Sequence, residues 1–172
     1  MRKIILNVAV SLDGFIEGSN GEYDWCFTDQ DYGMEAFTAS TDAIFIGRKS
    51  YALIAGENNP YFDKKLYIFS DTLAGVEGNA EIIRTKDFVD RIEQVRHEDG
   101  KDIWLFGGAS LVSAFTQHNY IYEMLLSVHP IILGSGKQLF ENLSDRIHLT
   151  LLNTEVFSSG LVQLRYTIKP KI

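Results

Sequence analysis

The stretch Ile103-Trp104-Leu105-Phe106-Gly107-Gly108-Ala109-Ser110-Leu111 decides how this chain folds. Its first four residues are all apolar, a pattern typical of a strand that is buried on both faces. Two glycines follow the strand, and we expect a helix over residues 110–118. A strand that leads straight into a helix is half of the crossover connection that joins parallel strands. The stretch therefore predicts an α/β domain with a largely parallel sheet.

The same alternation of strand and helix extends from this stretch toward both ends of the chain. Hydrophobic periodicity and the Gly and Pro breaks predict further strands over residues 3–11, 43–46, 65–70, 81–84 and 122–129, and helices over residues 31–41, 48–54 and 87–97. Near the C-terminus, residues 149–153 and 161–168 flank Ser158-Ser159-Gly160. That pattern predicts an antiparallel hairpin at the edge of the sheet.

The composition is that of an ordinary single-domain globular protein. The chain has 172 residues, of which 45% are hydrophobic and 23% are charged, so we expect one domain over residues 1–172. No apolar run approaches the ~20 residues of a membrane helix, and the short N-terminal run is typical of a strand rather than a signal peptide. The single cysteine, Cys26, excludes an internal disulfide and suits a reducing cytoplasm.

The charges and histidines exclude several kinds of partner. The net charge is −7, and the chain has no block of Lys and Arg that would neutralise a phosphate backbone, so nucleic acid is not an expected partner. The four histidines share no metal-ligand spacing with each other or with Cys26, so we expect no metal site. A small anionic ligand is still compatible with this composition, because a few cations and backbone N–H groups suffice to hold one.

The pair Gly107-Gly108 is the strongest functional signal. Glycines between a buried strand and a helix let the backbone approach a ligand where a Cβ would clash. The N-terminus of the following helix then presents unpaired N–H groups and the positive end of its dipole, which suit a pyrophosphate. A tight turn without a ligand also uses two glycines, so this motif alone leaves both interpretations open.

The segment Gly47-Arg48-Lys49-Ser50 repeats this arrangement after the predicted strand 43–46. A glycine, two cations and a hydroxyl at the start of a helix favour a phosphate monoester. An Arg-Lys pair is more often simply solvated, but its recurrence beside a second glycine turn favours a ligand. Ser70-Asp71-Thr72 follows a third strand. Because ligands of open α/β sheets bind beyond the carboxyl ends of the strands, all three motifs are expected near one site.

Carboxylates cluster between the first strand and the first helix, and two of them are candidate proton donors. Asp31 and Glu35 fall in the predicted helix 31–41, where either could protonate a bound heterocycle or anchor its N–C–N edge. Most carboxylates in such a segment are instead turn residues or helix N-caps, and Asp31 is itself a suitable N-cap.

Four segments spread over nearly the whole chain support a resemblance to a known family. They are Val10-Ser11-Leu12-Asp13-Gly14-Phe15-Ile16, Ile46-Gly47-Arg48-Lys49-Ser50-Tyr51, Leu105-Phe106-Gly107-Gly108 and His129-Pro130-Ile131-Ile132-Leu133-Gly134-Ser135-Gly136-Lys137-Gln138-Leu139-Phe140. With them the chain resembles the dihydrofolate-reductase-like family. The similarity is greatest to the branch related to the C-terminal reductase domain of the bifunctional riboflavin-biosynthesis deaminase/reductase.

The resemblance implies a three-layer fold, in which helices cover both faces of an eight-stranded, mostly parallel sheet with a C-terminal antiparallel hairpin. It also implies a reductase that transfers hydride from NADPH to a small pterin- or pyrimidine-like heterocycle. Carried over position by position, the pyrophosphate would be held by Gly107, Gly108, Ala109, Ser110 and Leu111, and the adenosine end would lie near Arg48, Lys49, Ser50 and Ser70. The nicotinamide would lie between Ala9 and Ile16, and Gly47 and Phe106 complete the cofactor-binding set.

Two departures from the family's pattern keep alternatives open. Asp71 stands where related reductases often have a cation or a hydroxyl, and its carboxylate would oppose a 2′-phosphate, so NADH remains an alternative to NADPH. The acidic residue on the first helix of true dihydrofolate reductases does not align with one position, because Asp31 and Glu35 are both within reach. The alternatives are therefore a nucleotide-binding protein of this fold without reductase activity and a true dihydrofolate reductase.

Members of this branch often form dimers, so the resemblance also implies a homodimer. Tyr120, Tyr122 and the apolar run 131–133 could contribute to its interface. The same residues could equally pack within a monomer, and the sequence does not distinguish the two arrangements.

Overall fold

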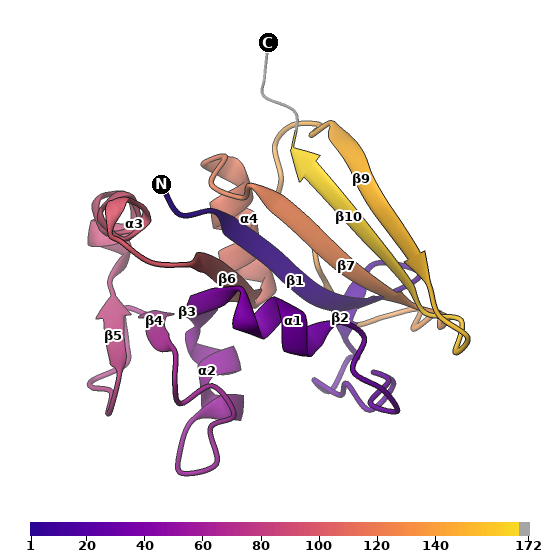
Figure 1. The fold of residues 1–172 in the computed structure, drawn as a ribbon, viewed down its shortest axis with the longest axis horizontal. Helices are drawn as coiled ribbons and strands as arrows, with labels where there is room; N and C mark the ends of the chain where they lie inside the picture. Colours follow the sequence, from indigo (N-terminus) through magenta and orange to yellow (C-terminus); the bar gives the residue numbers. More distant parts are fainter. Residues whose placement is uncertain (169–172) are drawn as a thin grey trace.

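The computed structural model describes residues 1–168, which contain one eight-stranded sheet (Figure 1). Its strands are β1 (Ile4–Ser11), β3 (Thr41–Gly47), β4 (Lys65–Phe69), β5 (Ala80–Ile83), β6 (Asp102–Gly107), β7 (Glu123–His129), β9 (Leu149–Val156) and β10 (Val162–Ile168). The strand order is β5-β4-β3-β6-β1-β7-β10-β9. Neighbours from β5 to β7 are parallel, and β10 is antiparallel to both β7 and β9. A separate two-stranded sheet pairs β2 (Phe15–Glu17) with β8 (Lys137–Gln138).

Helices cover both faces of the large sheet. They are α1 (Met34–Ala39), α2 (Arg48–Ile54), α3 (Phe88–His97) and α4 (Ala109–Gln117), and Figure 1 shows α1 in front of the sheet and α4 behind it. Successive residues of a strand point to opposite faces, so one apolar strand serves two cores. In β1, Leu6 packs into the cluster with Phe115 of α4, and Ile5 packs into the cluster with Phe37 of α1. The predicted three-layer fold is confirmed.

An aromatic cluster behind the sheet holds α4 in place. The Phe115 ring is fully buried, and its centroid lies 5.5 Å from those of Phe45 and Phe69 and 5.3 Å from that of Phe88. Burying one such side chain contributes roughly 1.5–3 kcal/mol to stability. Because these contacts reach β3, β4 and α3, the first turn of α4 is fixed at the carboxyl end of β6.

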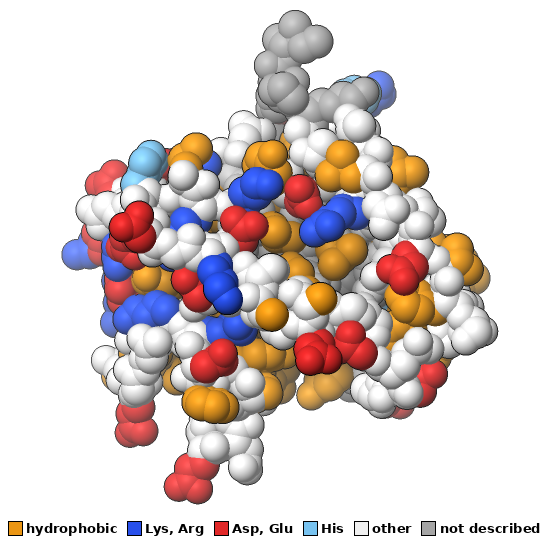
Figure 2. Space-filling model, viewed as in Figure 1, with side chains coloured by type: hydrophobic (Ala, Val, Ile, Leu, Met, Phe, Trp, Pro, Cys, Tyr) orange, Lys and Arg blue, Asp and Glu red, His pale blue; other side chains and the backbone are white. Residues whose placement is uncertain are grey.

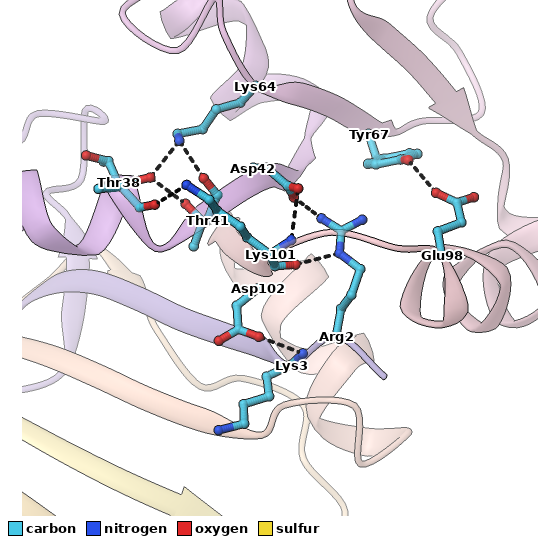
Figure 3. Close-up of polar contacts among 11 residues, drawn as sticks. Arg2, Lys3, Thr38, Thr41, Asp42, Lys64, Tyr67, Glu98, Lys101 and Asp102 are labelled. Atoms are coloured by element: carbon cyan, nitrogen blue, oxygen red, sulfur yellow. Dashed lines mark hydrogen bonds and ion pairs between the residues drawn. The ribbon is translucent and has the colours of Figure 1, made fainter.

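Paired charges lie at the amino-terminal ends of the parallel strands, called here the amino end of the sheet (Figure 3). Arg2 is buried, forms an ion pair with Asp42 and donates from Nε to the carbonyl oxygen of Lys101 at 2.6 Å. Lys64 is also buried, and its Nζ donates to the carbonyl oxygens of Thr38 and Thr41 at 2.7 and 2.8 Å. The buried cations at the amino end of the sheet are therefore already bound to a carboxylate and to backbone carbonyl groups.

The structure corrects some predicted element boundaries. The first helix begins at Met34 and not at residue 31, because Tyr32 (φ 51°) and Gly33 (φ 78°) adopt left-handed backbone conformations that end a right-handed helix. Strand β9 continues to Val156, three residues beyond the predicted end. Strands β2 and β8 were not predicted, because elements of three and two residues are too short to show a period. The predicted C-terminal hairpin is confirmed.

Among the described residues, no helix has both the length and the apolar character required to cross a membrane.

Candidate functional site

A cavity of about 830 Å³ lies at the carboxyl ends of the parallel strands. Its walls come from the segments that follow β1, β3, β4, β5 and β6, together with α3, α4 and β8. The lining residues are Ile16, Glu17, Gly47, Arg48, Lys49, Ser50, Phe69, Ser70, Asp71, Ile83, Thr85, Lys86, Phe88, Val89, Asp90, Gly108, Ala109, Ser110, Leu111, Ala114, His118 and Lys137. Ten of the thirteen predicted cofactor-binding residues are in this set.

The two glycine motifs lie side by side in the wall of the cavity. Strands β3 and β6 are neighbours, with Ile46 paired to Gly107. The turns that follow them are so close that a Cβ on Gly47 would lie 3.4 Å from the backbone nitrogen of Gly108. Both predicted phosphate-binding segments therefore face one space, although they are about sixty residues apart in the sequence.

The backbone conformation requires glycine at position 107 but not at position 108. Gly107 has φ +124°, a conformation that side chains of L-residues rarely adopt. Gly108 has φ −83° and ψ −160°, which any residue adopts, and a Cβ there would meet only Ser50 Oγ, at 3.6 Å. The peptide bond between them is cis. Space for a side chain therefore exists at Gly108 and opens into the cavity, as expected where a ligand approaches the backbone.

The first turn of α4 adds hydrogen-bond donors to this wall. The first bond of the helix runs from the Val112 N–H to the Gly108 carbonyl at 3.0 Å. The N–H groups of residues 109–111 precede that bond, and all three residues line the cavity. An anion beside Gly108 would meet these donors and the positive end of the helix dipole.

The cavity is locally cationic in an acidic protein. Its lining contains four Lys or Arg residues (Arg48, Lys49, Lys86 and Lys137) and three carboxylates, whereas the chain has net charge −7. Within residues 1–168, the side chains of Arg48, Lys49 and Lys86 form no hydrogen bond or ion pair, in contrast to the buried cations at the amino end of the sheet. Exposed cations without intramolecular partners are available to an anionic ligand.

Asp71, the residue that departs from the family's pattern, is held by the segment that follows β5. Its carboxylate accepts hydrogen bonds from the Thr85 hydroxyl at 2.6 Å and from the Thr85 N–H at 2.9 Å, and these bonds lower the pKa of Asp71 below its usual value. Arg84 donates to the carbonyl oxygens of Ser70 and Leu73 at 2.7 and 2.8 Å. The turn after β4 is thus fixed at the rim of the cavity with a negative charge on it.

Comparison with known proteins agrees with this geometry. Residues 2–163 match the family model described as the RibD C-terminal domain. The chain belongs to that family. It is 42% identical to YyaP of Bacillus subtilis (strain 168), over 96% of this chain and 94% of that protein.

Solved structures show the same fold. A protein from Shewanella sp. PV-4 whose name assigns it to riboflavin biosynthesis superposes with TM-score 0.82 and 24% identity, over 97% of this chain and 99% of that chain. Dihydrofolate reductase from Enterococcus faecalis, solved with NADP(H), superposes with TM-score 0.71 and 12% identity, over 96% of each chain. The fold is therefore that of dihydrofolate reductase, and the family match assigns the chain to the RibD C-terminal domain branch.

Three predicted cofactor-binding residues of this RibD C-terminal domain do not line the cavity. Ala9 lies in β1 opposite Ser127 and is half-buried. Gly107, at the end of β6, is buried. Phe106 lies on the face that carries α1 and α2, with its ring centroid 4.9 Å from that of Trp104. Ile16 alone of the two predicted nicotinamide neighbours reaches the cavity.

The candidate proton donors of the domain lie outside the cavity. Asp31 is exposed, and its carboxylate accepts the Glu35 N–H at 2.9 Å, so it caps the start of α1. Glu35 is also exposed and lines a shallow recess beside Tyr61 and Lys64. The structure places the Asp31 carboxylate against the backbone of Glu35 and brings neither carboxylate to the 830 Å³ cavity.

Polar groups that were not singled out from the sequence lie on the sheet face beneath α1. Asn7 is buried, and among residues 1–168 its amide nitrogen donates only to Met34 Sδ, at 3.6 Å. Gln163 is buried and donates to the Tyr32 carbonyl and to Ser127 Oγ at 2.7 and 3.2 Å. These side chains are neutral, and they adjoin Ala9 across β1, β7 and β10.

His129 is locked as a neutral ring at the end of β7. Its Nε2 accepts the Phe27 N–H at 3.1 Å, so Nδ1 carries the proton and donates to the Ser127 carbonyl at 2.9 Å. Burial lowers the pKa of His129 below its usual value, and the bond to Ser127 opposes that shift. Nε2 holds the 23–32 loop through Phe27, and Nδ1 is bonded within β7, so His129 has a structural role in the described contacts.

Sequence reasoning missed the cavity walls that come from β5, α3 and β8. Lys86, Phe88 and Val89 follow a parallel strand, so the rule that sites lie beyond carboxyl ends could have indicated them. Their helical pattern was interpreted only as a core face. Lys137 was quoted within the fourth segment of the resemblance but was given no role.

Proposed function

We propose that this protein is an NADPH-dependent reductase that transfers hydride to a small pterin- or pyrimidine-like heterocycle. The observation that carries the proposal is Gly108, whose backbone and packing do not require glycine although its missing side chain would project into a cationic cavity. Membership in the RibD C-terminal domain family supports the reductase class. The Enterococcus dihydrofolate reductase of the same fold was solved with NADP(H), which supports the cofactor.

The cavity residues divide the dinucleotide between them. Gly108, Ala109, Ser110 and Leu111 would bind the pyrophosphate, and Gly47, Arg48, Lys49, Ser50 and Ser70 would bind the adenosine end and its 2′-phosphate. Apolar side chains of α3 and α4 that line the cavity, Phe88, Val89 and Ala114, are suited to pack against a purine ring. Bound NADPH supplies the hydride. Asp71 at the rim is the feature that favours the alternative cofactor, NADH.

The substrate would lie on the α1 side of β1, with the nicotinamide between Ala9 and Ile16. Neutral amide and hydroxyl groups of Asn7, Ser127 and Gln163 on that face suit the donor and acceptor edge of an uncharged heterocycle. Orientation of the two rings would supply much of the rate enhancement. Asp31, Glu35 or a bound water would deliver the proton, and the carboxylates would need a bridging water to reach the ring.

The proposal is tested by titration with NADPH and NADH, followed by steady-state oxidation of the bound cofactor against pterins, ribosylaminopyrimidines and quinonoid compounds. We expect NADPH binding and turnover of at least one pyrimidine- or pterin-like compound. Binding without turnover across the panel would favour the nucleotide-binding alternative. Turnover confined to dihydrofolate would identify a true dihydrofolate reductase, and no binding of either cofactor at millimolar concentration would refute the proposal.

We also propose that the protein is a cytoplasmic homodimer. Strand β9 lies at the free edge of the sheet with Leu151 52%, Leu152 49% and Val156 74% exposed, and Figure 2 shows apolar side chains along that side of the molecule. Exposed apolar edge strands are suited to pair with a second chain. Of the residues considered from the sequence, Tyr122 and Ile132 are exposed and Tyr120 is half-buried. Light scattering that gives the 19.5 kDa monomer mass at all concentrations would refute the dimer.

A further inference from the structure

Residues 131–142, called here the strap, connect the turn after β1 to α4. Residues 131–139 of the strap form four hydrogen bonds with the Ser-Leu-Asp-Gly turn, two of them to the Asp13 side chain. These are Leu12 N–H to the Ile131 carbonyl at 2.9 Å, the Leu133 and Gly134 N–H groups to the Asp13 carboxylate at 3.1 and 2.8 Å, and the Leu139 N–H to the Gly14 carbonyl at 2.9 Å. The strap is thus fixed to the end of β1.

The other end of the strap is fixed to α4. Ser113 Oγ donates to the Glu141 carbonyl at 2.7 Å, and Gln117 Nε2 donates to the Asn142 carbonyl at 2.9 Å. Both ends of the strap are therefore held, and Lys137 between them lines the cavity. Lys137 is the strap residue that lines the cavity, and its partner across the β2–β8 pair is Glu17.

Lys137 is held beside the first turn of α4 by a carboxylate. Its Nζ lies 3.0 Å from Glu141 Oε1, and Ser110 Oγ donates to the same oxygen at 3.5 Å. An ammonium group has three N–H donors. One is directed at Glu141, and two are left for a ligand in the cavity that Lys137 lines.

The order of strands places Lys137 at one end of the cavity. The lining residues come from β5, β4, β3 and β6 in turn, and then from the segment after β1, where Ile16 and Glu17 lie. Lys86 follows β5 at the far end, whereas Lys137 pairs with Glu17 at the β1 end. With the adenosine held at the β4–β5 end, the second phosphate of the dinucleotide would lie between α4 and the strap.

We propose that Lys137 binds the nicotinamide-side phosphate of the dinucleotide pyrophosphate, and that Glu141 positions it there. The inference rests on the proposed cofactor and assigns the pyrophosphate a second wall, opposite the backbone of Gly108. It makes Lys137 a contact of the half of the dinucleotide that is common to NADPH and NADH.

The test uses three ligands in calorimetry with the full chain: NADPH, 2′-phospho-ADP-ribose, which keeps both phosphates of the pyrophosphate, and 2′,5′-ADP, which lacks the nicotinamide-side phosphate. Lys137→Gln should weaken the first two by about tenfold to a hundredfold, because one charge-assisted bond is lost. It should change 2′,5′-ADP binding by no more than about twofold. Lys137→Arg should keep most of the affinity, and Lys3→Gln, at the far edge of the sheet, should have no effect on any ligand.

The outcomes separate this inference from the proposed function. Wild-type protein that binds 2′-phospho-ADP-ribose, with a Lys137→Gln variant of unchanged melting temperature that weakens all three ligands equally or none of them, would overturn the role of Lys137 alone. Wild-type protein that binds none of the three ligands would overturn both proposals. Selective loss of the two pyrophosphate ligands, with rescue by arginine, supports the assignment.

Discussion

Replacing Gly108 by alanine should abolish tight cofactor binding while leaving the fold intact. The backbone at Gly108 has φ −83° and ψ −160°, and the new Cβ would meet only Ser50 Oγ at 3.6 Å, so the apo-protein accommodates the methyl group without strain. Glycine-to-alanine changes at compatible positions stabilise proteins by roughly 0.4–1 kcal/mol, through the unfolded state. The melting temperature of the apo-variant should therefore stay the same or rise slightly.

The loss in binding follows from the bonds that the methyl group displaces. A phosphate oxygen must approach the backbone N–H groups to ~2.9 Å, which a Cβ in the same space prevents. Each charge-assisted hydrogen bond contributes roughly 1.5–3 kcal/mol. Loss of two such bonds should raise the Kd for NADPH by about two to four orders of magnitude, at 1.4 kcal/mol for each factor of ten.

The neighbouring glycine provides a matched control for this experiment. Gly107 has φ +124°, so Gly107→Ala forces a side chain into a strained backbone and should destabilise the apo-protein by roughly 1–3 kcal/mol. Melting curves and NADPH titration of both variants distinguish a structural glycine from a ligand-binding one. A Gly108→Ala protein that is folded and binds NADPH with wild-type affinity would refute the reasoning.

Four further predictions concern individual side chains. Arg48→Ala should weaken NADPH by about tenfold to a hundredfold and NADH much less in calorimetry, because a 2′-phosphate contact is lost; equal weakening would place that contact elsewhere. Asp71→Asn should improve NADPH relative to NADH by about threefold, since a rim charge is removed, and an unchanged ratio would contradict this. Asp31→Asn or Glu35→Gln should lower kcat by about a hundredfold without changing the Kd for NADPH, and an unchanged kcat in both variants would refute a role for the carboxylates. The free energy of unfolding, measured in urea, should fall as the pH drops below about 6.5, by at most about 1.4 kcal/mol per pH unit. The cause is the lowered pKa of His129, because the unfolded chain binds a proton in a pH range where the folded chain does not. His129→Gln should remove that pH dependence.

The layered fold could be predicted because its signals are local. The apolar run at residues 103–106, the glycine pair and the helix that follows show their period within a few residues, and the C-terminal hairpin shows its alternation and its turn. The start of α1 could not be predicted in the same way. Its helical spacing extends back to residue 31, and only the left-handed conformations of Tyr32 and Gly33 end the helix earlier.

The lining of the cavity could be predicted in part for the same physical reason. Gly47 to Ser50 and Gly108 to Leu111 each form a compact segment at a strand end, so their chemistry is readable from neighbours in the sequence. The bonds of Asp71 to Thr85 and of Ser110 to Glu141 join residues 14 and 31 positions apart. Such pairs arise from the packing of one strand end against another, and no periodicity encodes them.

The distribution of cations between the two ends of the parallel strands explains how a chain of net charge −7 can offer a site for an anion. At the amino end of the sheet, Arg2 is paired with a carboxylate and Lys64 donates to carbonyl groups. Arg48, Lys49 and Lys86, at the edge where the strands end, have no such partners within the described residues. An anion that binds relieves the mutual repulsion of these cations, so their unpaired charges contribute to its binding free energy. Because salt screens charges beyond about 8 Å, the acidic remainder of the surface weakens this attraction little at short range. We therefore expect selection of the ligand to depend on geometry inside the cavity, where the Gly108 backbone and the cations face the same space.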